Sequence, residues 1–169
     1  MNIKEAIFKR RSVRKFKNMK VSDEKIQILL ECAMAAPSAC NKKPWAFYVV
    51  TNDEKLEELR KSSRYTGYKS PLNIIVCGDI SKSLSDKPND FWIQDASSAI
   101  ENILIEAVEL ELGTCWCGIF PMEIPQKNVK KILNLPENII PLGIIHIGYP
   151  DEEKEARTQF DESCVKYIK

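Results

Sequence analysis

The sequence predicts one layered domain of the α/β or α+β class, and three observations support this prediction. The chain has 169 residues, a length that suits a single domain with a sizeable core. Helical and strand patterns alternate along most of it, as layered domains require. Hydrophobic residues make up 44% and charged residues 29%, ordinary values for a soluble globular protein. Because no repeat, low-complexity segment or internal linker interrupts the pattern, we expect a single domain over residues 1–169.

Two helices are predicted near the start of the chain. Asn2 and Glu5 form a capping-box pattern that opens a short helix ending near Arg10. Ser22 caps the second helix, whose apolar residues recur at helical spacing. This helix is expected to stop at Pro37.

The next stretch predicts a strand, a helix and a strand. Residues 45–50 (WAFYVV) are rich in aromatic and β-branched side chains, which favour a strand. Residues 52–62 have the pattern of an amphipathic helix, and residues 73–79 (NIIVCGD) predict a second strand.

Residues 90–113 carry the longest helical pattern, with a broad apolar arc that predicts burial over much of the circumference. Gly113 is expected to close this helix at its C′ position. A third strand follows at 114–120. Pro125 can start a further helix, and residues 139–150 contain the fourth strand.

The chain changes character after Pro150. Residues 151–169 are polar, with scattered Phe160, Val165, Tyr167 and Ile168. Such a tail cannot form a core of its own, so it either frays or packs on another surface, such as a second subunit.

The charge balance limits the classes of partner. Lys and Arg number 25 and Asp and Glu 24, for a net charge of +1. Because no global field exists to hold DNA, RNA or an anionic membrane, we expect no nucleic-acid or membrane partner, and any anion site must be local. The N-terminus lacks the apolar region of a signal peptide and no apolar run could span a bilayer, so a cytoplasmic location is expected.

The cysteines and the histidine do not predict a metal site or a catalytic group. Six cysteines without a secretory signal are expected to remain reduced thiols. Cys115 and Cys117 form one CxC pair, for which buried packing is favoured over metal binding. His146, the only histidine, lies in a strand pattern that makes it a core or interface residue.

The segment RRSVRKF (10–16) is the first candidate for an anion site. The planar fork of arginine suits phosphate, and a serine hydroxyl adds a donor. The alternative is a solvated basic helix end that interacts with the helix dipole. Val13 and Phe16 are expected to anchor the segment to the core, and Lys15 to stay in solvent. No P-loop or GxGxxG spacing occurs in the chain.

Two further segments offer backbone and side-chain contacts to a ligand. In APSACNKKPWAF (36–47) the small residues would let a flat ligand approach, and Ser38 and Asn41 offer hydrogen bonds. In CWCGIFP (115–121) the backbone around Gly118 could face a ligand. The alternatives are an ordinary helix-to-strand loop and a strand end with a turn.

Taken in order, these segments resemble the nitroreductase family of FMN-dependent oxidoreductases. The resemblance rests on RRSVRKF, APSACNKKPW, the long helix with TCWCG after it, PLGIIHIGYP and Arg157. It spans nearly the whole chain, which is similar to the short members of the family. It implies an α+β, three-layer fold with a central, mostly antiparallel sheet flanked by helices. It also implies an intertwined homodimer with two FMN sites at the subunit interface, in which the tail from about 151 to 169 packs on the partner.

The resemblance implies twelve cofactor-binding residues, namely Arg10, Arg11, Ser12, Arg14, Pro37, Ser38, Ala39, Asn41, Gln94, Gly118, Ile119 and Arg157. The first four would contact the phosphate, the ribityl chain and the pyrimidine edge of FMN. The next four would come from the other chain and lie near the isoalloxazine. Gln94 would contact the ribityl chain or ring, the backbone at Gly118 and Ile119 would face flavin N5 and O4, and Arg157 would hold the phosphate.

The implied activity is hydride transfer from NADH or NADPH to flavin N5, and then to nitroaromatic, quinone or related acceptors, by a ping-pong mechanism. Flavin chemistry requires no general acid or base from the protein, so no catalytic residue is assigned. Arg10 or Arg14 would stabilise the negative charge of reduced flavin near N1 and O2. The alternatives are a specialised flavoenzyme of the same fold, such as a dehalogenase, a dehydrogenase or an oxygen-using flavin-cleaving enzyme, and an FMN-binding redox sensor without turnover.

Some positions depart from the family pattern. Lys43 stands before Pro-Trp where many relatives have a glutamine. In the short segment SSRYTGYKS, Arg64 and Lys69 are further candidates to reach the cofactor. Residues 80–90 are short and polar, and they offer little cover for a substrate.

Overall fold

The computed structural model describes residues 1–84 and 90–169. Within these residues the elements, in chain order, are α1 (Ile3–Lys9), α2 (Asp23–Met34), η1 (Ala39–Asn41), β1 (Trp45–Val50), α3 (Asp53–Arg60), β2 (Leu72–Asp79), α4 (Trp92–Glu109), β3 (Gly113–Gly118), α5 (Glu123–Leu133), β4 (Ile139–Gly148) and η2 (Glu162–Cys164). The two η elements are single 3₁₀ turns, and neither was predicted from the sequence.

The four strands form one sheet in the order β1-β2-β4-β3, and every neighbouring pair is antiparallel. The predicted α+β class is therefore confirmed, and the α/β alternative, which needs a mainly parallel sheet, is excluded. In this order β1 and β3 are the edge strands. The pairing also aligns Asn73 on β2 with His146 on β4, and His146 with Cys115 on β3, in one row across the sheet.

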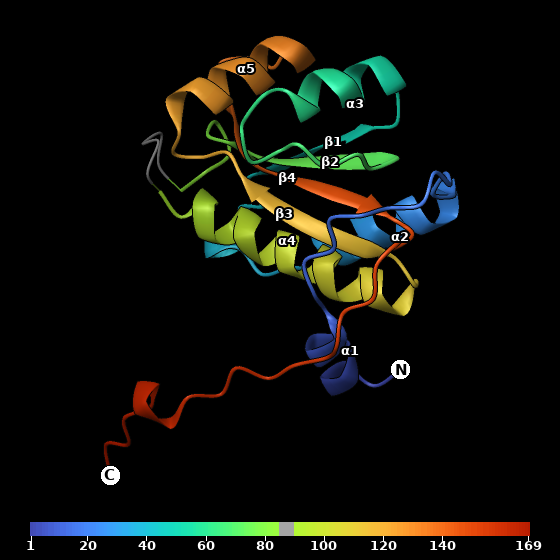
Figure 1. Cartoon of the computed structure of the whole chain (residues 1–169). Helices are drawn as coiled ribbons and strands as arrows, with labels where there is room; N and C mark the ends of the chain where they lie inside the picture. Colours follow the sequence, from blue (N-terminus) through green and yellow to red (C-terminus); the bar gives the residue numbers. More distant parts are fainter. Residues whose placement is uncertain (85–89) are drawn as a thin grey trace.

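Helices cover both faces of the sheet and make three layers, as expected (Figure 1). The helices α2 and α4 pack on one face, over a cluster that includes Leu29, Ile100 and Ile145. The helices α3 and α5 pack on the other face, over a smaller cluster that includes Leu59 and Ile144. Since successive strand residues point to opposite faces, Ile144 and Ile145 belong to different clusters.

The end of α4 differs from the prediction. The helix ends at Glu109, and the residue in the left-handed conformation after it is Glu111, with φ 60°, rather than Gly113. Gly113 instead begins β3, where an added Cβ would lie 2.8 Å from Cγ1 of Val13. The glycine is thus needed for close approach of the 10–16 segment to the strand, a tertiary requirement that the local pattern does not contain.

Other element ends shift by a few residues. The helix α2 ends at Met34, before Pro37, and α3 is capped by Asn52. The strand β3 ends at Gly118 rather than 120, and the next two N–H groups donate to the Leu142 carbonyl. The helix α5 begins at Glu123, so that Pro125 lies in its first turn, where the missing N–H costs nothing.

The tail leaves the layered body near α1 and runs away from it (Figure 1). It exposes 74% of Phe160, 76% of Tyr167 and 99% of Ile168. Packing of this tail on a partner subunit stays a prediction. Among the described residues, no helix has the length and apolar character needed to cross a membrane.

Candidate functional site

The basic segment 10–16 lies along the start of edge strand β3. Ser12 forms a parallel bridge with Thr114, and the Val13 N–H donates to the Thr114 carbonyl at 2.8 Å. Val13 is buried, while Phe16 is half-buried and bridges Pro150. Both residues therefore anchor the segment as predicted, and they leave the side chains of Arg14 and Lys15 exposed at the sheet edge.

Backbone contacts tie the start of the tail to this segment. The Arg157 N–H donates to the Phe8 carbonyl at 3.0 Å, and the Arg11 guanidinium donates to the Glu155 carbonyl. Arg10 Nε lies 3.7 Å from a carboxylate oxygen of Glu101 on α4. Three of the predicted phosphate-binding arginines, 147 positions apart at the extremes, thus come to one end of the sheet. This arrangement concentrates positive charge beside exposed backbone, which suits an anion.

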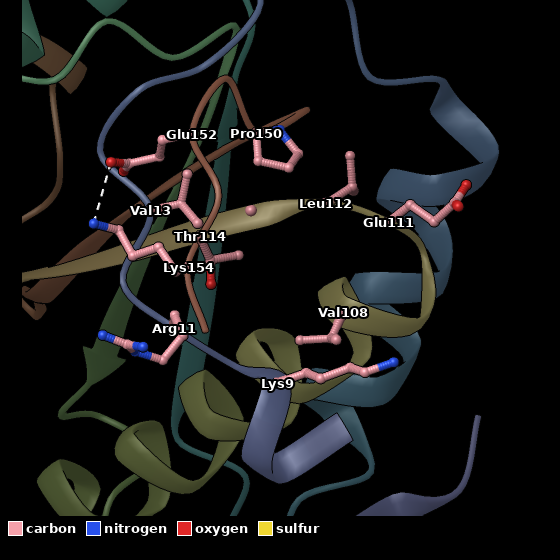
Figure 2. A pocket seen from close by; sticks show the side chains of 11 residues that line it. Lys9, Arg11, Val13, Val108, Glu111, Leu112, Thr114, Pro150, Glu152 and Lys154 are labelled. Carbon is pink, nitrogen blue, oxygen red and sulfur yellow. Dashed lines mark ion pairs between the residues drawn. The ribbon is translucent and has the colours of Figure 1, made fainter. Parts of the chain in front are cut away.

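A hollow of about 250 Å³ lies beside the basic segment, and Figure 2 shows the side chains that line it. The charged residues that line it are Lys9, Arg11, Glu111, Glu152 and Lys154. The Lys154 ammonium is 3.1 Å from a Glu152 carboxylate oxygen, the dashed line in the figure. The cations exceed the carboxylates by one, so the hollow carries a slight excess of positive charge.

Glu152 also holds the backbone of the basic segment. Its Oε1 accepts the Arg14 N–H at 2.6 Å and the Lys15 N–H at 3.3 Å. These two hydrogen bonds, with the Lys154 ammonium, lower the pKa of the Glu152 carboxyl. Glu152 therefore remains ionised and fixes the turn that presents Arg14. Sequence reasoning missed this role because the two partners are 138 positions apart.

The Arg14 side chain has its own set of partners. Its Nε donates to the Tyr68 hydroxyl at 3.1 Å, and this bond, followed by the charges of Cys115 and Cys117, raises the pKa of the guanidinium. The neighbouring Cys117, whose own S–H donates to the Tyr65 carbonyl, and the nearby Arg14 cation lower the pKa of the buried Cys115 thiol. Cys117 also lies 3.1 Å from the Tyr65 carbonyl, and both cysteines are buried as predicted.

The loop that follows α2 is held by the first turns of α4. The Ala39 N–H donates to Asp95 Oδ1 at 2.8 Å, and the Ser98 hydroxyl donates to the Pro37 carbonyl at 3.1 Å. Ser38 closes the loop on itself, because its hydroxyl accepts the Lys43 N–H at 3.0 Å.

The same loop is conformationally unusual. Cys40, Asn41 and Lys43 all have φ near +50°, a left-handed conformation that only asparagine among them adopts readily. Asn41 and Lys43 are exposed, as is Gln94 next to Asp95. Sequence reasoning missed Asp95, although a carboxylate within an apolar helical arc is a signal for a buried partner.

Gly118 and Ile119 differ in what they offer a ligand. Gly118 is exposed, and a Cβ added there would meet nothing within 4 Å, so a flat group could approach this backbone. Ile119 is fully buried, and its N–H already donates to the Leu142 carbonyl at 2.9 Å. A contact of the Ile119 N–H with a cofactor stays a prediction. It would require this N–H to donate to both the Leu142 carbonyl and the cofactor.

The predicted residues fall into two groups within one chain. The basic segment and Arg157 gather at the start of β3, whereas the 37–41 loop and Gln94 gather at the start of α4. Among the described residues no hydrogen bond or ion pair joins the loop to the basic segment. Gly118 lies four residues along β3 from Thr114, roughly 13 Å away.

Arg64 and Lys69 are the two further candidates to reach the cofactor. Among the described residues, neither forms a hydrogen bond with the basic segment. The Arg64 guanidinium donates to the neighbouring Tyr65 hydroxyl. Lys69 lines a larger cavity of about 950 Å³ between residues 16–21, α3 and residues 68–71. None of the twelve predicted cofactor residues lines this cavity. Of the 80–90 segment, residues 85–89 lie outside the described residues, so its role as substrate cover stays a prediction.

Comparisons with known proteins identify the family of this chain. The sequence model of the "Nitroreductase family" matches residues 7–70 and 63–149. A relative from Methanothermobacter thermautotrophicus, provisionally named an NADH dehydrogenase/NAD(P)H nitroreductase, is 40% identical over 163 residues, which are 95% of this chain and 84% of the relative.

Two solved structures extend the comparison. An FMN-dependent nitroreductase from Clostridium difficile R20291 superposes with a TM-score of 0.87 at 34% identity, covering 98% of both chains. A protein from Desulfovibrio desulfuricans, provisionally called a nitroreductase and solved with FMN, has a TM-score of 0.82 at 25% identity. That match covers 99% of this chain and 98% of the other.

Proposed function

This chain belongs to the nitroreductase family, and from that premise we propose that it is an FMN-dependent oxidoreductase that uses NADH or NADPH as reductant. The observation that carries the proposal is that the Arg157 backbone and the Arg10 and Arg11 side chains lie together near the end of α1, while the exposed backbone of Gly118 lies at the far end of β3. When bound, FMN supplies the redox chemistry, accepting hydride at N5 and reducing nitroaromatic, quinone or related acceptors in a ping-pong cycle.

The residues present fit this cofactor. A phosphate monoester carries nearly two negative charges. Arg11, Lys9 and Lys154, which line the hollow, offer charge-assisted donors, and Arg10 and Arg157 lie near Arg11 in the fold. Ser12 adds a hydroxyl at the bridge to Thr114. The absence of a side chain at Gly118 leaves open space where a flat ring would lie. Arg14, presented by Glu152, is the cation we assign to the pyrimidine edge.

We propose that the second group of residues in one chain contributes to the FMN site of a second copy of the chain. Pro37, Ser38, Ala39 and Asn41 would contact the isoalloxazine bound to the partner, and Gln94 would lie beside them. The absence of any polar contact between the two groups in the described part of one chain supports this reading. The exposed tail residues Phe160, Tyr167 and Ile168 support a homodimer in which the tail covers the other subunit. A cytoplasmic location is part of the same proposal.

The first test is purification followed by flavin spectroscopy. We expect flavin absorbance, taken up from added FMN if necessary, and bleaching on anaerobic addition of NADH or NADPH. Bound flavin that neither nucleotide reduces would favour an FMN-binding redox sensor instead. Failure to bind FMN at all would overturn the proposal.

A substitution tests the assignment of the phosphate site. Arg10→Ala removes a charge-assisted contact and is expected to weaken FMN binding roughly 10- to 150-fold, measured by quenching of flavin fluorescence. Arg60→Ala is the matched control, since Arg60 lies on α3 and pairs with Glu57. Equal FMN affinity in the two variants would contradict the assignment. Sedimentation of the flavin-bound protein tests the homodimer, which a monomer at micromolar concentration would exclude.

A further inference from the structure

The side chain of Arg14 is held by a neighbour that the sequence did not single out. Arg14 Nε donates to the Tyr68 hydroxyl at 3.1 Å, and the guanidinium carbon lies 5.8 Å from the centre of the Tyr68 ring. Tyr68 is half-buried and belongs to the segment between α3 and β2. The hydrogen bond through Nε restricts rotation of the guanidinium, and Nη1 in addition donates to the Ser12 carbonyl at 3.5 Å.

Tyr68 in turn rests on a buried polar cluster. Its ring meets the His146 ring edge to face, with centroids 5.5 Å apart and planes at 88°. His146 is fully buried in the middle strand β4, so its ring cannot shift without disturbing the sheet. The tyrosine is therefore supported by the most rigid part of the molecule.

Hydrogen bonds define the state of that histidine. The Ser70 hydroxyl donates to Asn73 Oδ1 at 2.7 Å and so has no second proton to give. Its oxygen must then accept from His146 Nδ1, which lies 3.0 Å away. This assigns the ring proton to Nδ1 and leaves Nε2 as a bare acceptor, for which the described residues provide no partner.

We propose that Tyr68 is a positioning residue, which holds the Arg14 guanidinium in the orientation that meets the flavin, while His146, Ser70 and Asn73 hold Tyr68. This inference rests on the proposed function, because it assigns Arg14 to FMN. A long, flexible side chain loses rotamer freedom when it binds a ligand, and fixing it beforehand reduces that loss. The contact therefore strengthens cofactor binding without touching the cofactor.

The same contact affects the redox balance of the flavin. A cation at the pyrimidine edge stabilises the negative charge of the reduced form more than it stabilises the neutral oxidised form. A guanidinium that moves among rotamers provides less of this differential stabilisation than a fixed one. Loss of the Tyr68 hydroxyl should therefore make the flavin harder to reduce as well as more weakly bound.

Tyr68→Phe in the full-length protein tests the proposal, since it keeps the ring against His146 and removes only the hydroxyl. We expect the Kd for FMN to rise about 3- to 10-fold and the midpoint potential of bound FMN to become more negative. Tyr48→Phe is the control, because Tyr48 is also half-buried but lies on β1, the opposite edge strand. Wild-type affinity and potential in Tyr68→Phe, or equal changes in both variants, would overturn the inference.

A measurement without flavin separates this inference from the proposed function. In the flavin-free protein the Arg14 Nε–H, identified in NMR spectra by its loss in Arg14→Lys, should exchange slowly with solvent. It should exchange rapidly in Tyr68→Phe. Failure of the wild type to bind FMN would contradict the proposed function but not the contact between Tyr68 and Arg14. Equal rates of Nε–H exchange in wild type and Tyr68→Phe would contradict the proposal that Tyr68 positions Arg14.

Discussion

The two faces of the sheet are both buried, but they differ in chemistry. The face toward α2 and α4 is lined on β2 and β4 by Ile74, Val76, Ile145 and Ile147. The face toward α3 and α5 interrupts its apolar residues with the row of Asn73, His146 and Cys115. Because a buried polar group costs free energy unless it is paired, an all-apolar second face would fold at least as well. The polar row lies under Tyr68 and Arg14, whose contact we propose to orient the guanidinium toward the flavin.

Removal of a large side chain on the apolar face is expected to have the largest effect. Ile145→Ala should lower the free energy of unfolding by about 2–5 kcal/mol, because it leaves a cavity in the fully buried cluster under α4. Chemical denaturation measures this loss. Val49→Ala, on a strand position that is 41% exposed, is the control and should cost under about 1 kcal/mol. Similar losses in the two variants would show that the apolar face is loosely packed.

The pH dependence of stability distinguishes the polar face. Burial lowers the pKa of His146 from its ordinary 6.5 to about 4. Between these values the unfolded chain binds a proton that the folded chain does not, so stability falls as the pH drops from 6.5 toward 4. At 1.36 kcal/mol per pKa unit the full loss is about 3 kcal/mol.

His146→Leu provides the comparison for this pH effect. The variant keeps every other titrating group, so its unfolding free energy should fall by about 3 kcal/mol less than that of wild type across the same pH interval. Denaturation curves at several pH values measure the difference. Parallel pH profiles for the two proteins would show that His146 does not titrate in this range. That result would contradict the prediction that the polar face makes stability depend on pH.

Loss of a single hydroxyl in the polar row is expected to have a smaller effect. Ser70→Ala removes the acceptor for His146 Nδ1 and the donor to Asn73. It should lower the free energy of unfolding by about 1–3 kcal/mol, because both partners stay buried without this hydrogen bond. Ser98→Ala removes the hydrogen bonds from the Ser98 hydroxyl to the Pro37 and Asp95 carbonyls on the α4 side. This change should lower the free energy of unfolding by about 0.5–1 kcal/mol. If Ser98→Ala were the more costly, the two faces would not differ in their dependence on polar contacts.

Much of the fold was predictable because its signals are local. The strand at 45–50 and the helix ending near Arg10 match the structure, since β-branched runs and capping residues act over a few positions. Burial of His146 followed from strand alternation. The helix end at Glu109, with Glu111 in the left-handed conformation after it, did not follow from the pattern, because Gly113 is required by the approach of Val13 from another part of the chain.

The candidate site was predictable in its residue types but not in its assembly. Arginine and serine made the 10–16 segment a candidate anion site, with a solvated basic helix end as the alternative, and the resemblance pointed to the anion FMN. The partners of these residues did not follow from either source. Glu152 presents Arg14, Asp95 holds the 37–41 loop, and Tyr68 orients a guanidinium 54 positions away. Side chains this far apart in sequence leave no periodic signal.

By itself, the sequence determined the layered class and the principal helices and strands, and it made the basic segment a candidate anion site, because hydrophobic period and side-chain chemistry are properties of short stretches. Only the tertiary structure decided that the Arg157 backbone returns to the first helix, that one face of the sheet carries a buried polar row, and that the predicted residues lie in two groups. These outcomes depend on strand order and register, which pair residues without regard to their separation along the chain.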